Sequence, residues 1–210
     1  MASIVVIYGT SEGQTAKIAE RIAGTLTERG HDVVARDVTH LPPSFSLAGD
    51  DAVLLGGSIH AGKQAPAVVQ FAGDHRDALA ASPSGFFQVC LAAAESDEES
   101  QAEAAGYVDD FRAATGWEPD RVAVFAGALR YSEYGFLKRL LMKAIAGRTT
   151  GDTDTSRDYE YTDWGAVEAF AAEFAADVEA AADADEGPDS QVDPDAEPDA
   201  AADEPAQPRR

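Results

Sequence analysis

Short apolar runs alternate with amphipathic stretches through most of the chain. The first run, residues 4–7, is continuous and largely β-branched, which is typical of a strand covered on both faces in a parallel sheet. Apolar residues then recur at helical spacing through residues 14–29. The same alternation predicts strands at residues 31–37, 51–56, 84–91 and 121–128, and helices at residues 65–79, at 101–115 and from Thr162 or Asp163 onward. We therefore expect an α/β fold, a doubly wound five-stranded parallel sheet with helices on both faces.

Three local features refine this outline. The strand at residues 31–37 is more polar than the others, which favours an edge position. Gly73 is expected to interrupt the helix at residues 65–79. The last helix carries an apolar stripe formed by Trp164, Val167, Phe170, Phe174 and Val178, which predicts packing against the sheet.

A cluster of hydroxyl side chains follows the first strand. Thr10, Ser11 and Thr15 surround Gly13 where a predicted strand passes into a predicted helix, a geometry in which backbone N–H groups converge on an anion. The triphosphate pattern GxxxxGK[ST] and the dinucleotide pattern GxGxxG are both absent. The pattern Thr-Ser-x-Gly-x-Thr resembles the FMN-phosphate loop of flavodoxins. The alternative is a hydroxyl-rich turn that only caps the helix.

Within this loop, Glu12 and Gln14 lie between the hydroxyl residues. A carboxylate does not suit an anion site, so we expect the Glu12 side chain to point to solvent while its amide points inward.

Two further strand ends are predicted to open into the same crevice, because parallel strands end at one edge of a sheet. The third strand passes into a flexible loop that contains Ser58, Ile59, His60, Ala61 and Gly62. The fourth strand leads into Leu91, Ala92 and Ala93, where small side chains permit a flat ring to approach.

Cysteine content and hydropathy restrict the class of protein. Cys90 is the only cysteine, which excludes an internal disulfide framework and a CxxC metal site, and its apolar surroundings indicate a small buried side chain rather than a nucleophile. No apolar run approaches the roughly 18 residues of a spanning helix, and a strand begins too early for a signal peptide. These features predict a cytoplasmic protein.

The formal net charge is −22, and only four of the sixteen basic residues are Lys. Such a surface argues against a nucleic-acid partner, because binding to phosphate backbones requires a basic surface. Acid-rich, Lys-poor surfaces resemble those of proteins from salt-accumulating halophiles, in which concentrated ions screen self-repulsion. We interpret the charge as an adaptation to habitat rather than as a sign of function.

Two segments exceed a minimal α/β sandwich, so we divide the chain into a domain at residues 1–182 and a tail at residues 183–210. The tail is acidic, rich in Pro and expected to be disordered. The other segment, an insertion at residues 129–161, has no acid at residues 135–148 but carries Lys138, Arg139, Lys143 and Arg148 beside large apolar residues. This composition predicts an amphipathic helix that rests on a membrane surface or covers an anionic apolar ligand. An ordinary helix packed on the domain is the alternative.

Several motifs resemble the menaquinone-dependent protoporphyrinogen IX dehydrogenase family. They are GQT at residues 13–15, Ser58-Ile59 with Gly62, WEPDR at residues 117–121, AGALRY at 126–131, TDT at 153–155 and YTDW at 161–164. The similarity runs from Ile4 to about Ala176. It implies a flavodoxin-like fold with strand order 2-1-3-4-5, an insertion before the last helix, and bound FMN. It also implies oxidation of protoporphyrinogen IX to protoporphyrin IX with menaquinone as acceptor, in haem biosynthesis.

The resemblance assigns roles to residues of this chain. The loop from Thr10 to Thr15 holds the FMN phosphate, while residues 58–62 and 91–93 flank the ring. Ala128, Leu129, Arg130 and Tyr131 approach from the insertion side. Arg130 is a catalytic candidate that meets the substrate propionates, and Lys138 and Arg139 are weaker candidates for that contact. Lys143 and Tyr134 complete the set of substrate or membrane candidates, and the helix at residues 135–148 implies peripheral contact with the inner face of the cell membrane.

The chain also departs from the family. His60 and Ala61 stand where the family tends to place a basic and an aromatic residue, so this loop lacks a ring-stacking side chain, for which Tyr131 or Tyr134 could compensate. His60 is the second catalytic candidate, either donating to reduced flavin or remaining a solvated loop residue, and no acid is near it in sequence. Two functional alternatives stay open. One is a flavodoxin-type electron carrier that docks on redox proteins, and the other is a flavin enzyme that uses nicotinamide.

Overall fold

The computed structural model describes residues 1–129, 154 and 156–185. Its central sheet contains the parallel strands β1 (Ser3–Tyr8), β2 (Asp32–Asp37), β3 (Ala52–His60), β5 (Ser84–Cys90) and β6 (Arg121–Ala126). They lie in the order β2-β1-β3-β5-β6. Counted without the short strand β4 (Lys63–Gln64), this is the predicted order 2-1-3-4-5, so the flavodoxin-like fold is confirmed. The polar strand β2 occupies an edge, as predicted.

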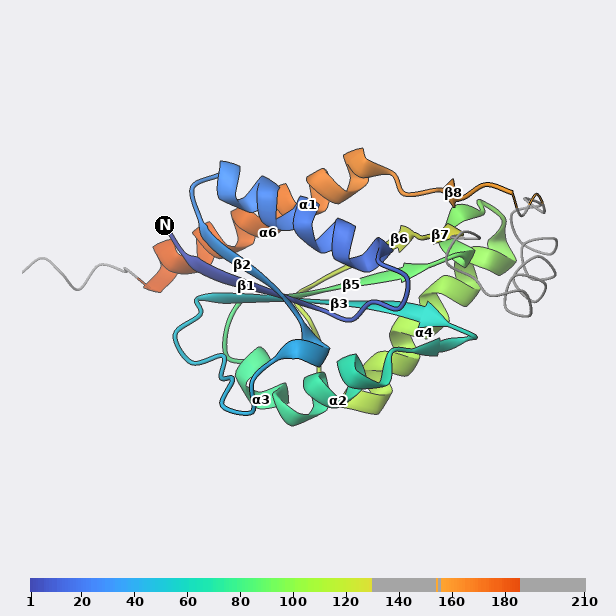
Figure 1. The fold of residues 1–210 in the computed structure, drawn as a ribbon. Coiled ribbons are helices and arrows are strands. Elements are labelled where there is room, and N and C mark those ends of the chain that lie inside the picture. The colour runs from blue at the N-terminus through green and yellow to red at the C-terminus, as the bar shows by residue number, and fades with distance from the viewer. Residues whose placement is uncertain (130–153, 155, 186–210) are drawn as a thin grey trace, which may run out of the picture.

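Helices cover both faces of the sheet (Figure 1). On one face lie α1 (Gln14–Glu28) and α6 (Trp164–Asp185), and on the other lie α2 (Pro66–Asp74), α3 (Arg76–Leu79) and α4 (Glu98–Thr115). Two short 3-10 helices, η1 (Val38–His40) and η2 (Ala92–Ala94), follow β2 and β5. Every crossover between the parallel strands therefore carries helical structure or a loop long enough to return to the same sheet edge.

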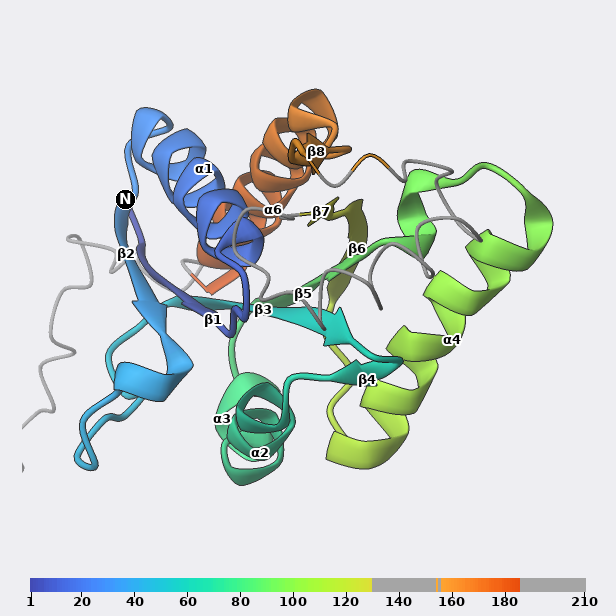
Figure 2. The ribbon, with the colours of Figure 1, turned by 45° about the vertical axis from the view of Figure 1, so that its right-hand side comes forward.

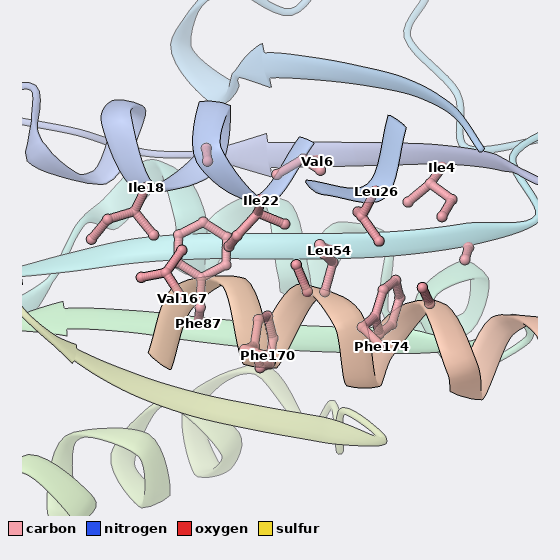
Figure 3. Packing of buried hydrophobic residues seen from close by; sticks show 14 of the residues in the cluster. Ile4, Val6, Ile18, Ile22, Leu26, Leu54, Phe87, Val167, Phe170 and Phe174 are labelled. Carbon is pink, nitrogen blue, oxygen red and sulfur yellow. The ribbon is translucent and has the colours of Figure 1, made fainter. Parts of the chain in front are cut away.

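Alternate residues of the strands point into two separate cores. One core joins Ile4, Val6 and Leu54 of the sheet to the apolar faces of α1 and α6 (Figure 3). The other joins the opposite side of the same strands to α2, α3 and α4. The predicted stripe of α6 is largely buried, since Val167, Phe170, Phe174 and Val178 are each at most 5% exposed.

The third strand is longer than predicted. Residues 58–60 belong to β3, which pairs antiparallel with β4 through Ile59 with Gln64 and His60 with Lys63. The intervening turn holds Ala61 at φ 49° and Gly62 at φ 74°, and two successive positive φ angles suit a tight hairpin. The prediction of a loop is therefore wrong: residues 58–60 belong to a strand, and residues 61–62 form the turn of a hairpin.

Helix boundaries also differ from the prediction. Gly73 lies inside α2, and the break falls at His75, whose Nδ1 lies 3.0 Å from the Phe71 carbonyl oxygen. The helix predicted at residues 101–115 starts earlier, at Glu98, because Asp97 caps it. At the C-terminal end, α6 continues through Asp185. Residues 183–185, expected in a disordered tail, are therefore helical, and the remainder of that tail lies outside the described residues.

The predicted fifth strand divides in two. β6 ends at Ala126, and after Gly127 the short strand β7 (Ala128–Leu129) pairs antiparallel with β8 (Tyr159–Glu160). The two ends of the insertion thus meet beside the sheet, while residues 130–153 and 155 lie outside the described part. None of the described helices combines the length and the apolar composition needed to cross a bilayer.

Candidate functional site

A pocket opens at the edge of the sheet where β1, β3, β5 and β6 end, the edge turned toward the viewer in Figure 2. It brings together ten residues predicted from the sequence, namely Thr10, Ser11, Glu12, Gln14, Thr15, Ser58, Ile59, His60, Leu91 and Ala128. Three lining residues were not predicted as site residues, namely Val89, Cys90 and Gly127. Val89 and Cys90 lie at the end of β5, and Gly127 directly follows β6. Their positions at predicted strand ends could have identified them from the sequence.

The first turn of α1 forms one wall of the pocket. Gly13 precedes the helix with φ 86°, and its N–H donates to Thr10 Oγ1 at 2.9 Å, which folds the hydroxyl loop back on itself. Among the described residues, no side chain caps α1, and the first turn of this helix contains no acidic residue. The first N–H groups of a helix have no partner within the helix, and together they carry partial positive charge. This end of α1 is therefore suited to an anionic ligand group.

A second polar group faces the same pocket. The Ser58 side-chain oxygen is buried and has no hydrogen-bond partner among the described residues. A buried hydroxyl without a partner costs about 1–3 kcal/mol, so a ligand that pairs with it gains affinity. The hydroxyl loop, the uncapped helix and this orphaned oxygen fit the phosphate and the polar edge of a flavin mononucleotide.

The apolar part of the pocket is formed by Ile59, Val89 and Leu91. Cys90 lies beside them, is 3% exposed, and has a thiol pKa that burial raises above its usual value. A thiol that stays protonated is a poor nucleophile, in agreement with the interpretation of Cys90 as a buried small side chain.

Glu12 and His60 meet at the mouth of the pocket. Glu12 Oε1 lies 3.9 Å from His60 Nδ1, and the Glu12 side chain is only 16% exposed while that of His60 is 48% exposed. The prediction that the Glu12 side chain points to solvent is therefore wrong. The acid near His60 lies 48 positions away in sequence, and the parallel pairing of β1 with β3 brings the two residues together.

Hydrogen bonds tie α1 to the opposite side of the pocket. Gln14 Nε2 donates to Thr162 Oγ1 at 2.9 Å, and the Thr162 hydroxyl donates to the Ala126 carbonyl oxygen at 2.7 Å. The Thr162 hydroxyl is engaged in these two bonds and does not cap α6. Asp163 caps the helix instead, because its carboxylate accepts from the Ala166 N–H at the start of α6. These bonds fix the first turn of α1 relative to the end of β6.

A second tie lies one turn further along α1. Lys17 Nζ lies 3.1 Å from Glu160 Oε2, and Trp164 Nε1 donates to Glu160 Oε1 at 3.0 Å. Burial alone would raise the pKa of Glu160, but hydrogen bonds from Lys17 and Trp164 outweigh it and hold the pKa below its usual value. Glu160 therefore stays ionised and joins α1 to the base of the insertion.

The other predicted site residues either lie away from the pocket or fall outside the described part of the chain. Gly13 directly precedes α1, and Ala61 lies in the turn of the β3–β4 hairpin. Gly62 borders a separate cavity of about 480 Å³ between α2 and α4. Leu129 is fully buried, and Ala92 and Ala93 belong to η2, which follows β5. Arg130, Tyr131, Tyr134, Lys138, Arg139 and Lys143 lie outside the described residues.

Comparison with known proteins gives a consistent result. Residues 5–156 match the family model described as a flavodoxin domain. The chain is 38% identical over 174 residues to a Leishmania major protein named protoporphyrinogen IX dehydrogenase [quinone], a match that covers 82% of this chain and 74% of that protein. An Escherichia coli K12 protein of the same name is 34% identical over 171 residues, covering 81% of this chain and 93% of that protein. These relatives do not bear out the expected halophilic origin.

A solved structure supports the fold alone. Rubredoxin oxygen:oxidoreductase from Desulfovibrio gigas matches with a TM-score of 0.50 and 14% identity. The match covers 85% of this chain and 36% of that protein.

Proposed function

Because this chain belongs to the family of quinone-dependent protoporphyrinogen IX dehydrogenases and contains a flavodoxin domain, we propose that it binds FMN and oxidises protoporphyrinogen IX with a quinone as acceptor. The observation that carries the proposal is the uncapped start of α1, which shares one pocket with the hydroxyl loop and the orphaned oxygen of Ser58. Such a pocket binds a phosphate monoester without a basic side chain.

Each wall of the pocket has a distinct task. The first N–H groups of α1, with Thr10, Ser11 and Thr15, bind the phosphate, and the Ser58 hydroxyl pairs with a polar atom of the ring system. Ile59, Val89 and Leu91 exclude water from one side of the ring. Bound flavin supplies the two-electron oxidation chemistry. The chain itself contributes position, a dry surface and electrostatics.

Finer features of the function rest on the resemblance and on charge. We propose menaquinone as the acceptor, a role in haem biosynthesis, and contact of the basic insertion with the inner face of the cell membrane. Lys138, Arg139 and Lys143 supply positive charge in an otherwise acidic chain, which suits anionic lipid or the propionates of a porphyrin. Arg130 and Tyr134 are the other candidates for substrate contact.

A direct assay tests the main proposal. Full-length protein loaded with FMN is mixed without oxygen with protoporphyrinogen IX and a menaquinone analogue, and porphyrin fluorescence is recorded. We expect porphyrin to form only when flavin, quinone and protein are all present. Absence of turnover, together with rapid reduction of a partner redox protein, would favour the electron carrier instead.

A matched pair of variants links the assay to the pocket. Thr15 is 1% exposed and lines the pocket, whereas Thr25 lies on the outer face of the same helix. Thr15→Val removes a hydroxyl from the phosphate site and should weaken FMN binding about tenfold, because hydrogen bonds to charged groups are worth about 1.5–3 kcal/mol. Thr25→Val should leave FMN binding unchanged. Equal effects of both variants would contradict the assignment of the loop.

Charge reversal tests the insertion separately. Replacing Lys138, Arg139 and Lys143 by Glu should lower porphyrinogen turnover or binding to anionic vesicles while FMN stays bound. If neither property changes, the basic segment has only a structural role.

A further inference from the structure

A buried amide lies on β5, one residue before the part of this strand that lines the proposed flavin pocket. Gln88 is 0% exposed, although an amide in an apolar core is destabilising unless its polar atoms are paired. Its Oε1 accepts from Gln64 Nε2 at 2.8 Å, and its Nε2 donates to the Ala104 carbonyl oxygen at 2.9 Å. These three groups form an amide bridge that joins β4, β5 and α4.

The bonds settle the orientation of both amides. A backbone carbonyl can only accept, so the Gln88 nitrogen faces Ala104 and the Gln88 oxygen faces Gln64. The Gln64 nitrogen must then face Gln88, which leaves Gln64 Oε1 buried and without a hydrogen-bond partner among the described residues. Stability alone therefore does not account for the amide bridge, because an apolar pair of similar shape would fill the space without an orphaned atom.

Gly57 makes room for the amide bridge. It lies on β3, directly opposite Gln88 of β5. A Cβ at position 57 would stand 2.8 Å from Gln64 Oε1, which is closer than such atoms normally approach. The Gln64 side chain therefore passes across β3 where that strand has no side chain, and so reaches from β4 to β5.

The amide bridge connects two segments that line the pocket. One segment is residues 58–60 of β3, in which Ile59 pairs with Gln64 of β4. The other is residues 89–91, which directly follow Gln88. A change in the distance between the two segments would change the width of the pocket between them.

Apolar packing between these segments is thin. Among the described residues, the buried cluster at this place consists of Cys90, Ala92 and Ala104, and Ile59 packs against it. Small side chains bury little apolar area and make few contacts, so they fix the distance between two segments only loosely. Directional hydrogen bonds through Gln88 supply the constraint that this packing lacks.

We propose that Gln64 and Gln88 are positioning residues of the flavin pocket, whose amide bridge fixes the spacing of residues 58–60 and 89–91 and so prepares the pocket for the flat ring. This inference rests on the proposed flavin site. A prepared pocket loses less conformational freedom when its ligand binds. The proposed phosphate site at the start of α1 contains neither glutamine, so the amide bridge should affect binding of the ring and not of the phosphate.

Flavin titrations of the full-length chain separate these two parts of the cofactor. Dissociation constants for FMN and for riboflavin, which has no phosphate, are obtained from quenching of flavin fluorescence. Gln88→Leu removes both hydrogen bonds and should raise both Kd values about tenfold, because the two segments must then be ordered on binding. The ratio of the two Kd values should stay unchanged, since it reports the phosphate site.

Spectroscopy of bound FMN gives a second measure of the same separation. The visible circular dichroism of the flavin reports the surroundings of the ring and should change in Gln88→Leu. The ³¹P resonance of the bound phosphate should stay where it is in the unaltered chain. A shifted ³¹P resonance with unchanged circular dichroism would refute the proposal.

A double-mutant cycle shows whether the two glutamines act together. Gln64→Leu should weaken both flavins by a factor similar to that of Gln88→Leu. The double variant should lose no more than the larger single loss, because either change alone breaks the amide bridge. Losses that multiply would refute it. Gln64 is only partly buried, so Gln64→Leu tests the proposal by itself if Gln88→Leu does not fold.

Ser84→Ala is the matched control for loss of a buried polar group. Ser84 is 1% exposed and lies at the other end of β5, where its Oγ is 3.2 Å from Asp120 Oδ2. This variant should lower the Tm but leave the Kd values of both flavins unchanged. If it weakens flavin binding as much as Gln88→Leu does, the effect is general destabilisation and the proposal is refuted.

The outcomes also separate this inference from the proposed function. If both flavins bind and Gln88→Leu changes neither Kd, the flavin site stands and the positioning role is refuted. If Gln88→Leu weakens FMN but not riboflavin, the amide bridge acts on the phosphate site and the proposal is wrong. If neither flavin binds to the unaltered chain, the proposed function fails and this inference fails with it.

Discussion

The helices α1 and α4 both begin at the edge where the parallel strands end, yet their first turns are built differently. In α4, the Asp97 side chain accepts from the Ser100 N–H at 3.0 Å, and Glu98 and Glu99 add negative charge to the first turn. In α1, Gly13 has no side chain to cap the helix, and the first turn has no acid. The described part of the chain thus caps the start of α4 with its own side chain but gives the start of α1 no such cap, as expected of a start that binds a ligand.

This difference is the one expected between a stabilised helix end and the proposed phosphate site. A side-chain cap stabilises a helix by pairing with free N–H groups, but it also occupies the positions that a phosphate would need. The start of α1 lacks that stabilisation. Two other hydrogen bonds hold it in place, from the Gly13 N–H to Thr10 Oγ1 and from Gln14 Nε2 to Thr162 Oγ1. Four substitutions test the comparison, from the largest expected effect to the smallest.

The strongest test gives α1 the kind of start that α4 has. Gly13→Asp places a carboxylate at the helix end, and a Cβ there meets no neighbour within 4 Å. We expect FMN affinity, measured by fluorescence quenching, to fall about 100-fold because the new charge repels the phosphate. Gly13→Asn is the matched control, since Asn has the same shape and also tolerates positive φ. Equal losses in both variants would point to backbone strain rather than to charge.

The second test loosens the hydroxyl loop. Thr10→Val removes the acceptor for the Gly13 N–H, so the loop loses the bond that holds it closed. FMN affinity should fall about tenfold, the equivalent of roughly 1.4 kcal/mol, while Thr10→Ser should retain most of it. If Thr10→Val binds FMN as the unaltered chain does, the bond does not shape the site.

The third test removes the cap of α4. Asp97→Ala should lower the Tm by a few degrees and leave FMN affinity unchanged. Hydrogen bonds from the backbone N–H of Ser100, and to a smaller extent from its side chain, hold the pKa of Asp97 below its usual value. The stabilisation is therefore present at neutral pH and is lost as the pH falls through the folded-state pKa. Asp97→Asn should retain much of the cap without that pH dependence, and a loss of FMN binding in Asp97→Ala would contradict the comparison.

The smallest effect concerns the tie between α1 and the insertion. Glu160→Gln breaks the ion pair with Lys17, and because both side chains are substantially exposed, the loss of stability should be at most about 0.5 kcal/mol. Since the pKa of Glu160 is held below its usual value, this contribution is present at neutral pH and disappears in acid as the carboxylate protonates. Urea unfolding at neutral and acidic pH measures it. A larger loss in acid than at neutral pH would contradict this sign.

Much of the fold, and the position of the hydroxyl loop between β1 and α1, could be predicted from the sequence, whereas phosphate binding by that loop stays a prediction. The continuous run at residues 4–7 predicts a buried strand because both of its faces must be apolar. The hydroxyl residues come soon after this strand in the chain, so their place at its carboxyl end could also be predicted. Errors arose where strand pairing decided the outcome. Ser58, Ile59 and His60 were predicted in a loop, but Ser58 pairs with Val89 of β5, and Ile59 and His60 pair with β4, so all three belong to β3. The break after α2 falls at His75, whose ring stacks on that of Phe71, rather than at Gly73.

The sequence by itself determined the order of elements, the parallel sheet and the position of the hydroxyl loop, because hydrophobic periodicity and turn chemistry act over a few residues. Only the tertiary structure decided that Glu12 faces His60, that Thr162 holds Gln14, and that the Ser58 hydroxyl is left without a protein partner among the described residues. These relations join loops that are far apart in the chain. They exist because parallel strands deliver their ends to one edge of the sheet, where side-chain directions are set by packing rather than by local sequence.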